Sequence, residues 1–413
     1  MANSKTLPPR IGSLDQFRGY SVVAMFVVNF LGWLAITHHF LKHNNTHFSY
    51  ADSIMPSFIF ICGFTYRMSW LKRTKADLPI SETYRKFLFR SIGLILLSLM
   101  FFGFSSKIET WSTLSAAKAI RFVAELIKAN MWEVLAIIGA LQILIMPLMN
   151  RTAWIRVLAL LLFGIIHFLL CWSFNYEFVY GRANWMDDLW GTTGKRAWDG
   201  GCFGLLAWGQ IMLAGTIAFD ISNSALTEPA GPRVAATRFL LLGTVAMLLG
   251  YCVSCLTRFY DLESVSKDEK SHVSSPVIPD LHLATGRSWS QLMAEPPFVQ
   301  PPPPTERAIN YWMMDKRVVT QSFVWFSMGF ALALYGLFVV ACDIAGVRIG
   351  LFEMFGRNPL AAYIINHLVN HTIFSIVPKD SPLVWSLCGL SMALGVTCWF
   401  VKFLDDRKLY LRL

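Results

Sequence analysis

Apolar runs of about twenty residues recur along this chain, and they constrain its fold more than any other feature. A helix of about 20 residues is what the hydrocarbon core of a bilayer requires. Backbone polar groups inside that core must be satisfied within the segment, so such segments span as helices. The composition agrees, because 55% of the 413 residues are hydrophobic and only 15% are charged. A soluble globule, a disordered tail and a fibrous repeat are therefore excluded.

Hydropathy predicts an all-α, polytopic integral membrane protein with about ten transmembrane helices, forming one membrane domain over residues 1–413. The predicted spans are Phe17 to Ile36, Ser53 to Leu71, Phe87 to Phe104, Met131 to Met149, Trp154 to Phe174, Phe203 to Phe219, Phe239 to Leu256, Thr320 to Val340, Leu360 to Val377 and Leu383 to Phe400. The shorter segment Ala116 to Lys128 mixes charged and apolar residues at helical spacing, so we expect it to lie at the membrane interface.

The basic residues predict the orientation of these helices. The formal net charge is +10, but Lys and Arg are scattered through short loops rather than gathered on one element, which argues against a nucleic-acid partner. With the N-terminus inside, about 20 of them lie on the inner side and about 9 on the outer side, once the longest loop is set aside. The segment Arg67 to Arg90 dominates that count. We therefore predict that both termini are cytoplasmic (N-in, C-in).

The longest loop, Thr257 to Arg317, is predicted to be an extracytoplasmic insertion within the membrane domain. It contains the run EPPFVQPPPPTE, whose prolines favour extended polyproline structure. A polar, proline-rich segment has little apolar surface to bury, so we expect a loosely ordered spacer. Recognition of a partner by the four consecutive prolines is the alternative interpretation.

The densest polar cluster follows the first predicted span. Asn29 lies near the end of that span, and the loop HHFLKHNNTHFSYAD then carries four of the nine histidines before Asp52. A carboxylate at the start of a helix can stabilise the helix N-terminus and also accept a hydrogen bond from an imidazole. An N-cap followed by an interfacial loop is the alternative to a functional site. The histidine spacing fits a metal site poorly.

Three stretches of sequence, in order, resemble the heparan-alpha-glucosaminide N-acetyltransferase family. They are LDQFRGYSVVAMFVVNF with the following KH and ADSIMPSFIFICG, then WDGGCFGLLAWGQIMLAGTIAFD, and last FGRNPLAAYII. Members of that family are membrane enzymes that pass acetyl from acetyl-CoA to a terminal amino sugar. The likeness runs from about Ser13 to the C-terminus, with the proline-rich loop as an unmatched insertion.

The resemblance implies roles for three residues of the polar cluster. It makes His43 the catalytic histidine, Asp52 its partner and Asn29 a polar group at the same site. These residue types suit the chemistry, since a neutral imidazole can take a proton from an amine and a carboxylate can stabilise the imidazolium. An amide can donate a hydrogen bond to the thioester oxygen. Because this loop is spaced differently from the family pattern, His47 and His39 stay as alternatives to His43.

The last of the three stretches supplies candidate CoA-binding residues. Arg357 and Asn358, with Arg348 nearby, precede the ninth predicted span on its cytoplasmic side. Arginines there can pair with phosphates of acetyl-CoA, aided by the helix N-terminus that follows. Ordinary positive-inside arginines before a helix-initiating proline are the equally weighted alternative.

Two further features concern the outer side of the membrane. Asp199, in the sequence WDGG, begins the sixth predicted span after a stretch rich in tryptophan, which suits either an aromatic belt or a platform for sugars. The outer end of the fourth predicted span, where Glu133 lies, is a costly place for a carboxylate, and one interpretation is that Glu133 faces the active cavity.

Together these observations predict a multi-pass acyltransferase of a bacterial plasma (inner) membrane. We expect it to transfer acetyl, or another short acyl group, from cytoplasmic acyl-CoA to an amino or hydroxyl group of an extracytoplasmic sugar or glycan. The expected partners are acyl-CoA, the glycan acceptor and membrane lipid, with acetyl-CoA as the donor and no metal; a homo-oligomer is left open. A transporter or flippase, with the histidine-rich loop as its gate, and a non-catalytic membrane partner are the competing hypotheses.

Overall fold

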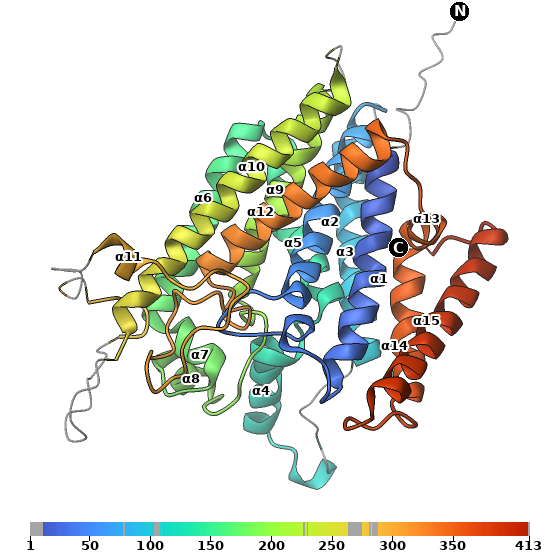
Figure 1. Cartoon of the computed structure of the whole chain (residues 1–413). Helices are drawn as coiled ribbons and strands as arrows, with labels where there is room; N and C mark the ends of the chain where they lie inside the picture. The colour runs from blue at the N-terminus through green and yellow to red at the C-terminus, as the bar shows by residue number, and fades with distance from the viewer. Residues whose placement is uncertain are drawn as a thin grey trace, which may run out of the picture. The chain divides into compact units, whose positions relative to one another are not determined.

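The structure is a computed structural model that describes residues 11–76, 79–102, 108, 110–225, 228, 230–262, 275–280, 282 and 288–411. These residues form helices joined by loops (Figure 1), and no β-strand occurs among them, only an isolated bridge between Asp261 and Arg307. The predicted all-α fold is therefore confirmed. The chain divides into two compact units: a terminal unit, Met1–Ile36 with Ile221–Leu242 and Leu332–Arg412, and a central unit, Thr37–Asp220 with Gly243–Ala331.

Several of the described helices are long and apolar enough to cross a membrane. Five meet this standard: Ala153–Tyr180, Gly204–Ala225, Gly231–Tyr260, Gln321–Ile344 and Leu383–Asp406. Ala116–Asn130 and Val134–Leu148 meet it jointly, although the two are bent by 92° relative to each other. This bend lies at residues 131–133, the start of the predicted fourth span.

The remaining four predicted spans coincide with helices that are too polar or too short to meet that standard. These are α1 (Gly12–Trp33), α2 (Tyr50–Thr74), α3 (Ile80–Phe102) and α14 (Pro359–Ile373); residues 103 and 104 of the predicted third span lie outside the described residues. In α2 the polar residues have a plain cause, because 16 of its 25 residues are buried and face protein. The count of ten spans therefore stays a prediction.

The terminal unit joins the two ends of the chain. It contains α1, η8 (Val339–Ile344), α13 (Gly350–Arg357), α14 and α15 (Leu383–Asp406). Helices α1 and α13 approach so closely that a Cβ atom on Gly19 would lie 1.7 Å from the Phe352 carbonyl oxygen, and one on Gly356 would lie 2.2 Å from that of Asp15. Small residues at both crossing points permit this backbone contact. We call this contact the α1–α13 clasp.

Polar contacts reinforce the clasp. Arg18 donates to the Gly356 carbonyl oxygen at 3.0 Å, and the side-chain amide of Gln16 both donates to and accepts from the backbone of Ile349, at 3.2 Å each. The Ser13 backbone amide donates to the Asp343 carboxylate at 3.0 Å, which satisfies a donor in the first turn of α1. The residues of the LDQFRG stretch therefore hold the helix in place.

Helices α14 and α15 pack side by side within the same unit (Figure 1). A buried ladder of polar side chains connects them, in which Asn370 donates to Asn366 at 3.0 Å and Asn366 donates to Thr397 at 3.4 Å. An apolar cluster accompanies the ladder and consists of Phe30, Leu34, Ile373, Val377 and Ala393.

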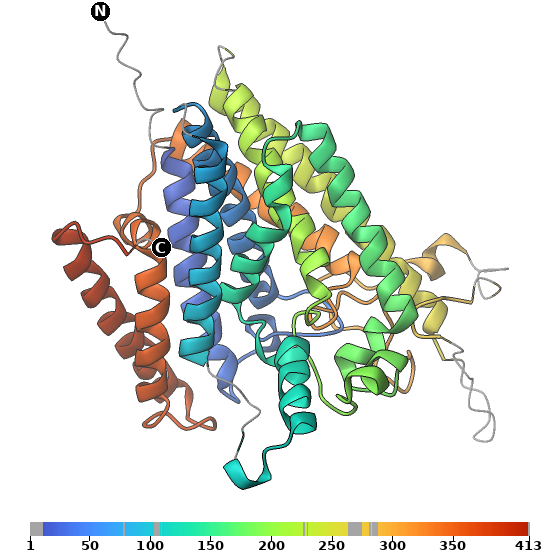
Figure 2. The ribbon, with the colours of Figure 1, turned by 180° about the vertical axis from the view of Figure 1, so that it is seen from behind.

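The central unit is built around α2. Its further elements are η1 (His39–Leu41), α3, η2 (Trp111–Thr113), α4 (Ala116–Glu125), η3 (Leu126–Asn130), α5 (Val134–Ile145), η4 (Met146–Leu148), α6 (Ala153–Leu170), η5 (Cys171–Asn175), α7 (Tyr176–Tyr180), α8 (Trp185–Trp190), most of α9 (Gly204–Ala225), part of α10 (Gly231–Ser254), η6 (Cys255–Tyr260), α11 (Trp289–Leu292) and part of α12 (Gln321–Phe338). Glycines again permit close helix contacts, since a Cβ atom on Gly63 of α2 would lie 2.0 Å from the Met212 carbonyl oxygen of α9. Figure 2 shows α3 against α5, where Gly139 faces the Ser91 carbonyl oxygen.

The loops that matter for function lie at one end of the central unit. The loop before α2, the short helices α7 and α8, the turn before α9 and the segment before α12 gather there (Figure 1). Backbone hydrogen bonds join them: Phe48 donates to Pro297 at 2.8 Å, and Gly200 donates to Arg317 at 2.7 Å.

Candidate active site

His43 and Asp52 form a hydrogen-bonded pair at this end of the central unit. Nδ1 of His43 lies 2.8 Å from Oδ1 of Asp52. The Asp52 side chain is 1% exposed, whereas that of His43 is 43% exposed. A buried carboxylate that accepts from Nδ1 fixes the neutral tautomer with its proton on Nδ1. Nε2 of this partly exposed ring is then left as a proton acceptor.

The start of α2 explains why Asp52 is held firmly. The N-cap is Ser49 and not Asp52, because the Ser49 hydroxyl oxygen accepts from the Asp52 backbone amide at 3.2 Å. Asp52 lies in the first turn, where its Oδ2 atom accepts from the Asn44 backbone amide at 3.1 Å and lies 2.7 Å from the Ser49 hydroxyl. The carboxylate thus has partners on both oxygens, and its charge also suits the helix N-terminus.

An aromatic anchor immobilises the loop between the two residues. Phe48 is fully buried, and its ring packs against those of Phe298, Phe326 and Phe323 at centroid distances of 5.6, 4.8 and 5.8 Å. Its backbone amide bonds to Pro297, as noted above. The histidine-rich loop is therefore a packed element at this point.

The WDGG turn brings a second carboxylate to the same region. Asp199, Gly200 and Gly201 have φ angles of +51°, +78° and +59°, a run of left-handed conformations that glycine tolerates and other residues rarely adopt. A Cβ atom on Gly204 would lie 2.3 Å from the Asp199 carbonyl oxygen, so this position also requires glycine. Burial raises the pKa of Asp199, although the charges of Lys316 and His43 lower it. Lys316 forms an ion pair with Asp199 at 3.8 Å.

A cleft of about 650 Å³ opens beside His43. Its lining includes His43, Asn44, Tyr180, Arg182, Arg196 and Arg317. This volume is within the usual range for a small-molecule site. The sequence analysis singled out His43 alone among these residues. Periodicity offered no signal for the others, because they come from separate loops that only the fold brings together.

Buried contacts hold one wall of this cleft. The Tyr180 hydroxyl donates to Asp315 at 2.5 Å, and Asp315 also accepts from the Arg317 backbone amide at 2.7 Å. Asp315 is fully buried, and burial raises its pKa to about 6 despite these hydrogen bonds. The Arg317 guanidinium stacks over the Trp198 ring at 3.9 Å.

The other histidines of the loop have different surroundings. His47 is buried, its Nδ1 atom lies 3.1 Å from the Thr46 hydroxyl, and burial and then the charge of His39 lower its pKa. His38 accepts from the Phe40 backbone amide and caps η1. The His39 ring lies 3.9 Å from that of His38. The described geometry pairs Asp52 with His43 alone among these four histidines.

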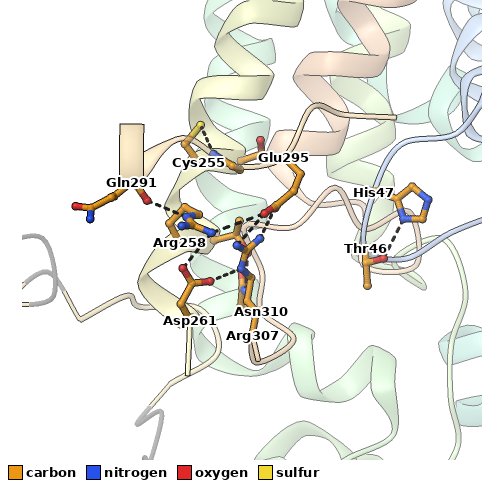
Figure 3. Close-up of polar contacts among 12 residues, drawn as sticks. Thr46, His47, Cys255, Arg258, Asp261, Gln291, Glu295, Arg307 and Asn310 are labelled. Carbon is orange, nitrogen blue, oxygen red and sulfur yellow. Dashed lines mark hydrogen bonds and ion pairs between the residues drawn. The ribbon is translucent and has the colours of Figure 1, made fainter. Parts of the chain in front are cut away.

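Figure 3 shows a charge network close to His47. Arg307 is fully buried and contacts Asp261 and Glu295, each at 2.5 Å. Arg258 lies 3.2 Å from Asp261 and donates to the Gln291 carbonyl oxygen at 2.8 Å. A small pocket between this network and His47 is lined in part by prolines.

This network corrects the expectation of a loosely ordered spacer between Thr257 and Arg317. Residues 307–317 are packed, with Asn310, Tyr311 and Asp315 buried, whereas the described side chains from 288 to 306 are exposed or half-buried and are held through contacts such as that of Glu295 with Arg307. The expectation failed because hydropathy counts charged residues as solvent-facing, whereas a buried Arg307 with two carboxylate partners is well accommodated. Residues 263–274, which include the run SKDEK, lie outside the described residues.

The remaining predicted site residues lie in the terminal unit. Asn29 is exposed on α1, and Arg348 is exposed before α13. Arg357 forms ion pairs with Glu353 and with Asp405, the latter at 3.0 Å. The roles of these residues stay predictions.

Asn358 is buried and holds the C-terminal segment. Its side-chain amide donates to the Leu409 carbonyl oxygen at 3.0 Å, and its oxygen accepts from the Leu411 backbone amide at 3.2 Å. Both ends of this side chain have partners in the protein, as do the terminal nitrogens of Arg357. Any contact of these residues with phosphate requires that those bonds be shared or exchanged.

The fold and the site define an integral membrane protein with several apolar helices and an exposed imidazole held by a buried carboxylate. Residues 10–251 match the family model described as heparan-alpha-glucosaminide N-acetyltransferase, catalytic. The match covers more than half of the chain, so the chain belongs to this family of membrane acetyltransferases. It includes His43, Asp52 and the WDGG turn and ends before the FGRNPLAAYII stretch. No curated protein gave a match.

Proposed function

We propose that this protein transfers acetyl from cytoplasmic acetyl-CoA to an amino or hydroxyl group of an extracytoplasmic sugar or glycan. The observation that carries the proposal is the His43 and Asp52 pair beside a cleft of small-molecule size. Membership of the acetyltransferase family supports the reaction type. The donor, the acceptor and the orientation in the membrane are part of the proposal.

In the proposed reaction, Nε2 of His43 takes a proton from the acceptor amine or hydroxyl as that group attacks the thioester carbon. Asp52 stabilises the imidazolium that forms and keeps the ring oriented. The carbon–sulfur bond then breaks, and the thiolate of CoA leaves with the proton from His43. Transfer through an acetyl-histidine would use the same nitrogen as nucleophile, so both routes require a neutral His43.

The proposed topology has about ten spans with both termini in the cytoplasm of a bacterial plasma membrane. Acetyl-CoA would then enter near Arg348, Arg357 and Asn358, and Asn29 would donate to the thioester oxygen. Basic residues near these positions support the entrance. Arg357 and Asn358 already have partners within the terminal unit. Arg348 is therefore the most available of the three to bind a phosphate of CoA.

A transfer assay tests the proposal directly. Purified full-length protein in detergent is incubated with acetyl-CoA labelled in its acetyl group and with glucosamine as the simplest amino-sugar probe. We expect labelled N-acetylglucosamine together with free CoA thiol, and loss of both in His43→Ala. The assay is repeated with a panel of amino sugars and sugar alcohols. If the wild-type protein neither transfers nor hydrolyses the acetyl group with any of them, the proposed function is rejected in favour of the transporter hypothesis.

A further inference from the structure

The cleft beside His43 is lined by positively charged side chains. Three arginines, Arg182, Arg196 and Arg317, belong to its lining together with His43, and none of the described lining residues is acidic. Arg182 has an ion-pair partner in Glu177 at 3.3 Å. Arg196 is exposed. Like charges gathered around one concave space repel one another, so an anion bound there would lower the electrostatic energy.

Arg317 is positioned in advance for such an anion. Its guanidinium stacks on Trp198, its backbone amide is held by Asp315, and its Nε atom is buried without a hydrogen-bond partner among the described residues. A guanidinium fixed by stacking keeps its N–H edge available for a planar or tetrahedral oxyanion. Arg182 lies over the Tyr180 ring in a similar way, at 5.0 Å.

The glycine turn at Gly194 leaves room in the cleft, whereas a Cβ atom on Gly181 would lie 3.0 Å from the Gly194 carbonyl oxygen. Gly181 and Gly194 both line the cleft and have φ angles of +70° and +84°. A Cβ atom on Gly194 would meet nothing within 4 Å, so open space lies next to this turn.

We infer that this arginine-lined cleft binds an anionic group of a substrate next to His43. The group is a phosphate, sulfate or carboxylate. Its source is either the acceptor sugar or the phosphates of CoA, both of which offer the same chemistry to Arg317, Arg196 and Arg182. The second source would replace Arg348, Arg357 and Asn358 as the residues proposed to bind phosphate. The place of this anion in catalysis rests on the proposed function, but its binding does not.

Calorimetry with pyrophosphate tests the anion site without any transfer reaction. Full-length wild-type protein in neutral detergent should bind pyrophosphate, and added salt should weaken the binding. Arg317→Gln and Arg196→Gln should each lower the affinity about ten- to a hundredfold, as expected for loss of a charged hydrogen bond. Arg196 is exposed, so its variant should fold normally. Arg151→Gln, which removes an exposed arginine elsewhere in the central unit, is the control and should bind like wild type.

Steady-state kinetics then identify the source of the anion. If it belongs to the acceptor, Arg317→Gln should lower kcat/KM about tenfold or more for glucosamine 6-phosphate and leave glucosamine within twofold. If it belongs to CoA, the same variant should raise the KM for acetyl-CoA and leave S-acetylpantetheine unchanged. Either result supports the anion site.

The site and the proposed function fail in different ways. If the protein has no transfer activity but binds pyrophosphate in a way that depends on Arg317 and Arg196, the anion site is supported and the proposed function is rejected. Active protein that binds no pyrophosphate, or whose Arg151→Gln control loses as much affinity as Arg317→Gln, would overturn the anion site.

Discussion

At the scale of single residues, one imidazole differs from its neighbours in the same loop. His43 joins a buried carboxylate on one side and a cleft on the other, whereas His47 is buried beside a proline-lined pocket. Proton transfer requires both an oriented ring and access to the substrate. The two histidines therefore serve as a matched pair for experiment.

His43→Ala should lower the rate of acetyl transfer by about 10² to 10⁴, the usual cost of losing acid-base catalysis. Because CoA is proposed to bind mainly through its nucleotide and phosphates, the affinity for acetyl-CoA should stay within a few fold. Initial rates with labelled acetyl-CoA and equilibrium binding measure the two quantities. His47→Ala is the control and should keep most of the rate. An inactive His47→Ala together with an active His43→Ala would mean that His47, not His43, is the catalytic histidine.

Asp52→Asn separates orientation from charge. Ser49 supplies the N-cap, so the variant should fold, and the amide still lies within reach of His43. An amide does not stabilise an imidazolium as a carboxylate does, and its nitrogen favours the wrong tautomer. We expect normal thermal stability with a fall in kcat of at least about a hundredfold. Unchanged kcat would mean that Asp52 only stabilises the start of α2.

Asp315 gives a pH dependence whose sign can be worked out. Burial raises the pKa of this carboxyl to about 6 in the folded protein, above its ordinary value of 3.8. Between about pH 4 and pH 6 the folded state therefore holds a proton that the unfolded state has lost, and this contribution to the free energy of unfolding falls as pH rises, by up to about 3 kcal/mol. Chemical denaturation at pH 4.5 and pH 7 measures it. Asp315→Asn should reduce the difference between the two pH values; an unchanged difference would assign it to other groups.

Much of the site could be predicted from sequence where a motif is local, and little where it is not. His43 and Asp52 are nine residues apart, and one loop brings them together. Tyr180 lies 135 positions before Asp315, and Arg317 follows two positions later, so nothing in their local patterns indicates a shared wall. An N-cap at Asp52 was the alternative interpretation, and the structure gives that position to the Ser49 hydroxyl, three residues earlier.

At the scale of elements, the proline-rich segment is the clearest difference between expectation and structure. Prolines lack a backbone donor but keep their carbonyl oxygens, and the one of Pro297 accepts from Phe48. Phe298 adds its ring to the cluster around Phe48. The segment therefore supports the loop that carries His43, although its composition is typical of a linker.

Glu295→Ala should destabilise the protein because it removes one of two carboxylates from the buried Arg307. Breaking a buried ion pair costs about 3 to 5 kcal/mol, and the remaining contact with Asp261 should reduce this to about 2 kcal/mol. The midpoint of thermal unfolding in detergent measures the effect. Glu306→Ala, at an exposed position of the same segment, is the matched control. Equal midpoints for the two variants would restore the interpretation of this segment as a spacer.

At the scale of the whole molecule, the fold class followed from composition and the number of spans did not. Long apolar runs predict helices directly, and the five clearest of them were found as expected. A helix such as α2 is surrounded by protein, so its hydropathy reports on neighbouring helices more than on lipid. For helices of this kind, length and polarity do not determine the number of membrane spans.

The predicted orientation can be measured by labelling intact cells. Gln300→Cys and Lys75→Cys both place a thiol at an exposed position. A membrane-impermeant maleimide should add label to Gln300→Cys in intact cells and to Lys75→Cys only after permeabilisation, relative to the parent with its own cysteines. Label on Lys75→Cys in intact cells would reverse the orientation and move the proposed entrance for acetyl-CoA to the other side.

The α1–α13 clasp has a consequence for synthesis of the chain. Arg18 is made before its partner Gly356, which follows 338 positions later. At translation rates of about 5 to 20 residues per second, α1 would wait from roughly 20 seconds to about a minute before its polar side chains and glycine surface meet their partners. During that interval the nascent chain exposes a helix whose packing face has no native cover. Insertion factors or chaperones that shield polar groups of membrane helices should therefore associate with α1 until ribosomes have completed α13.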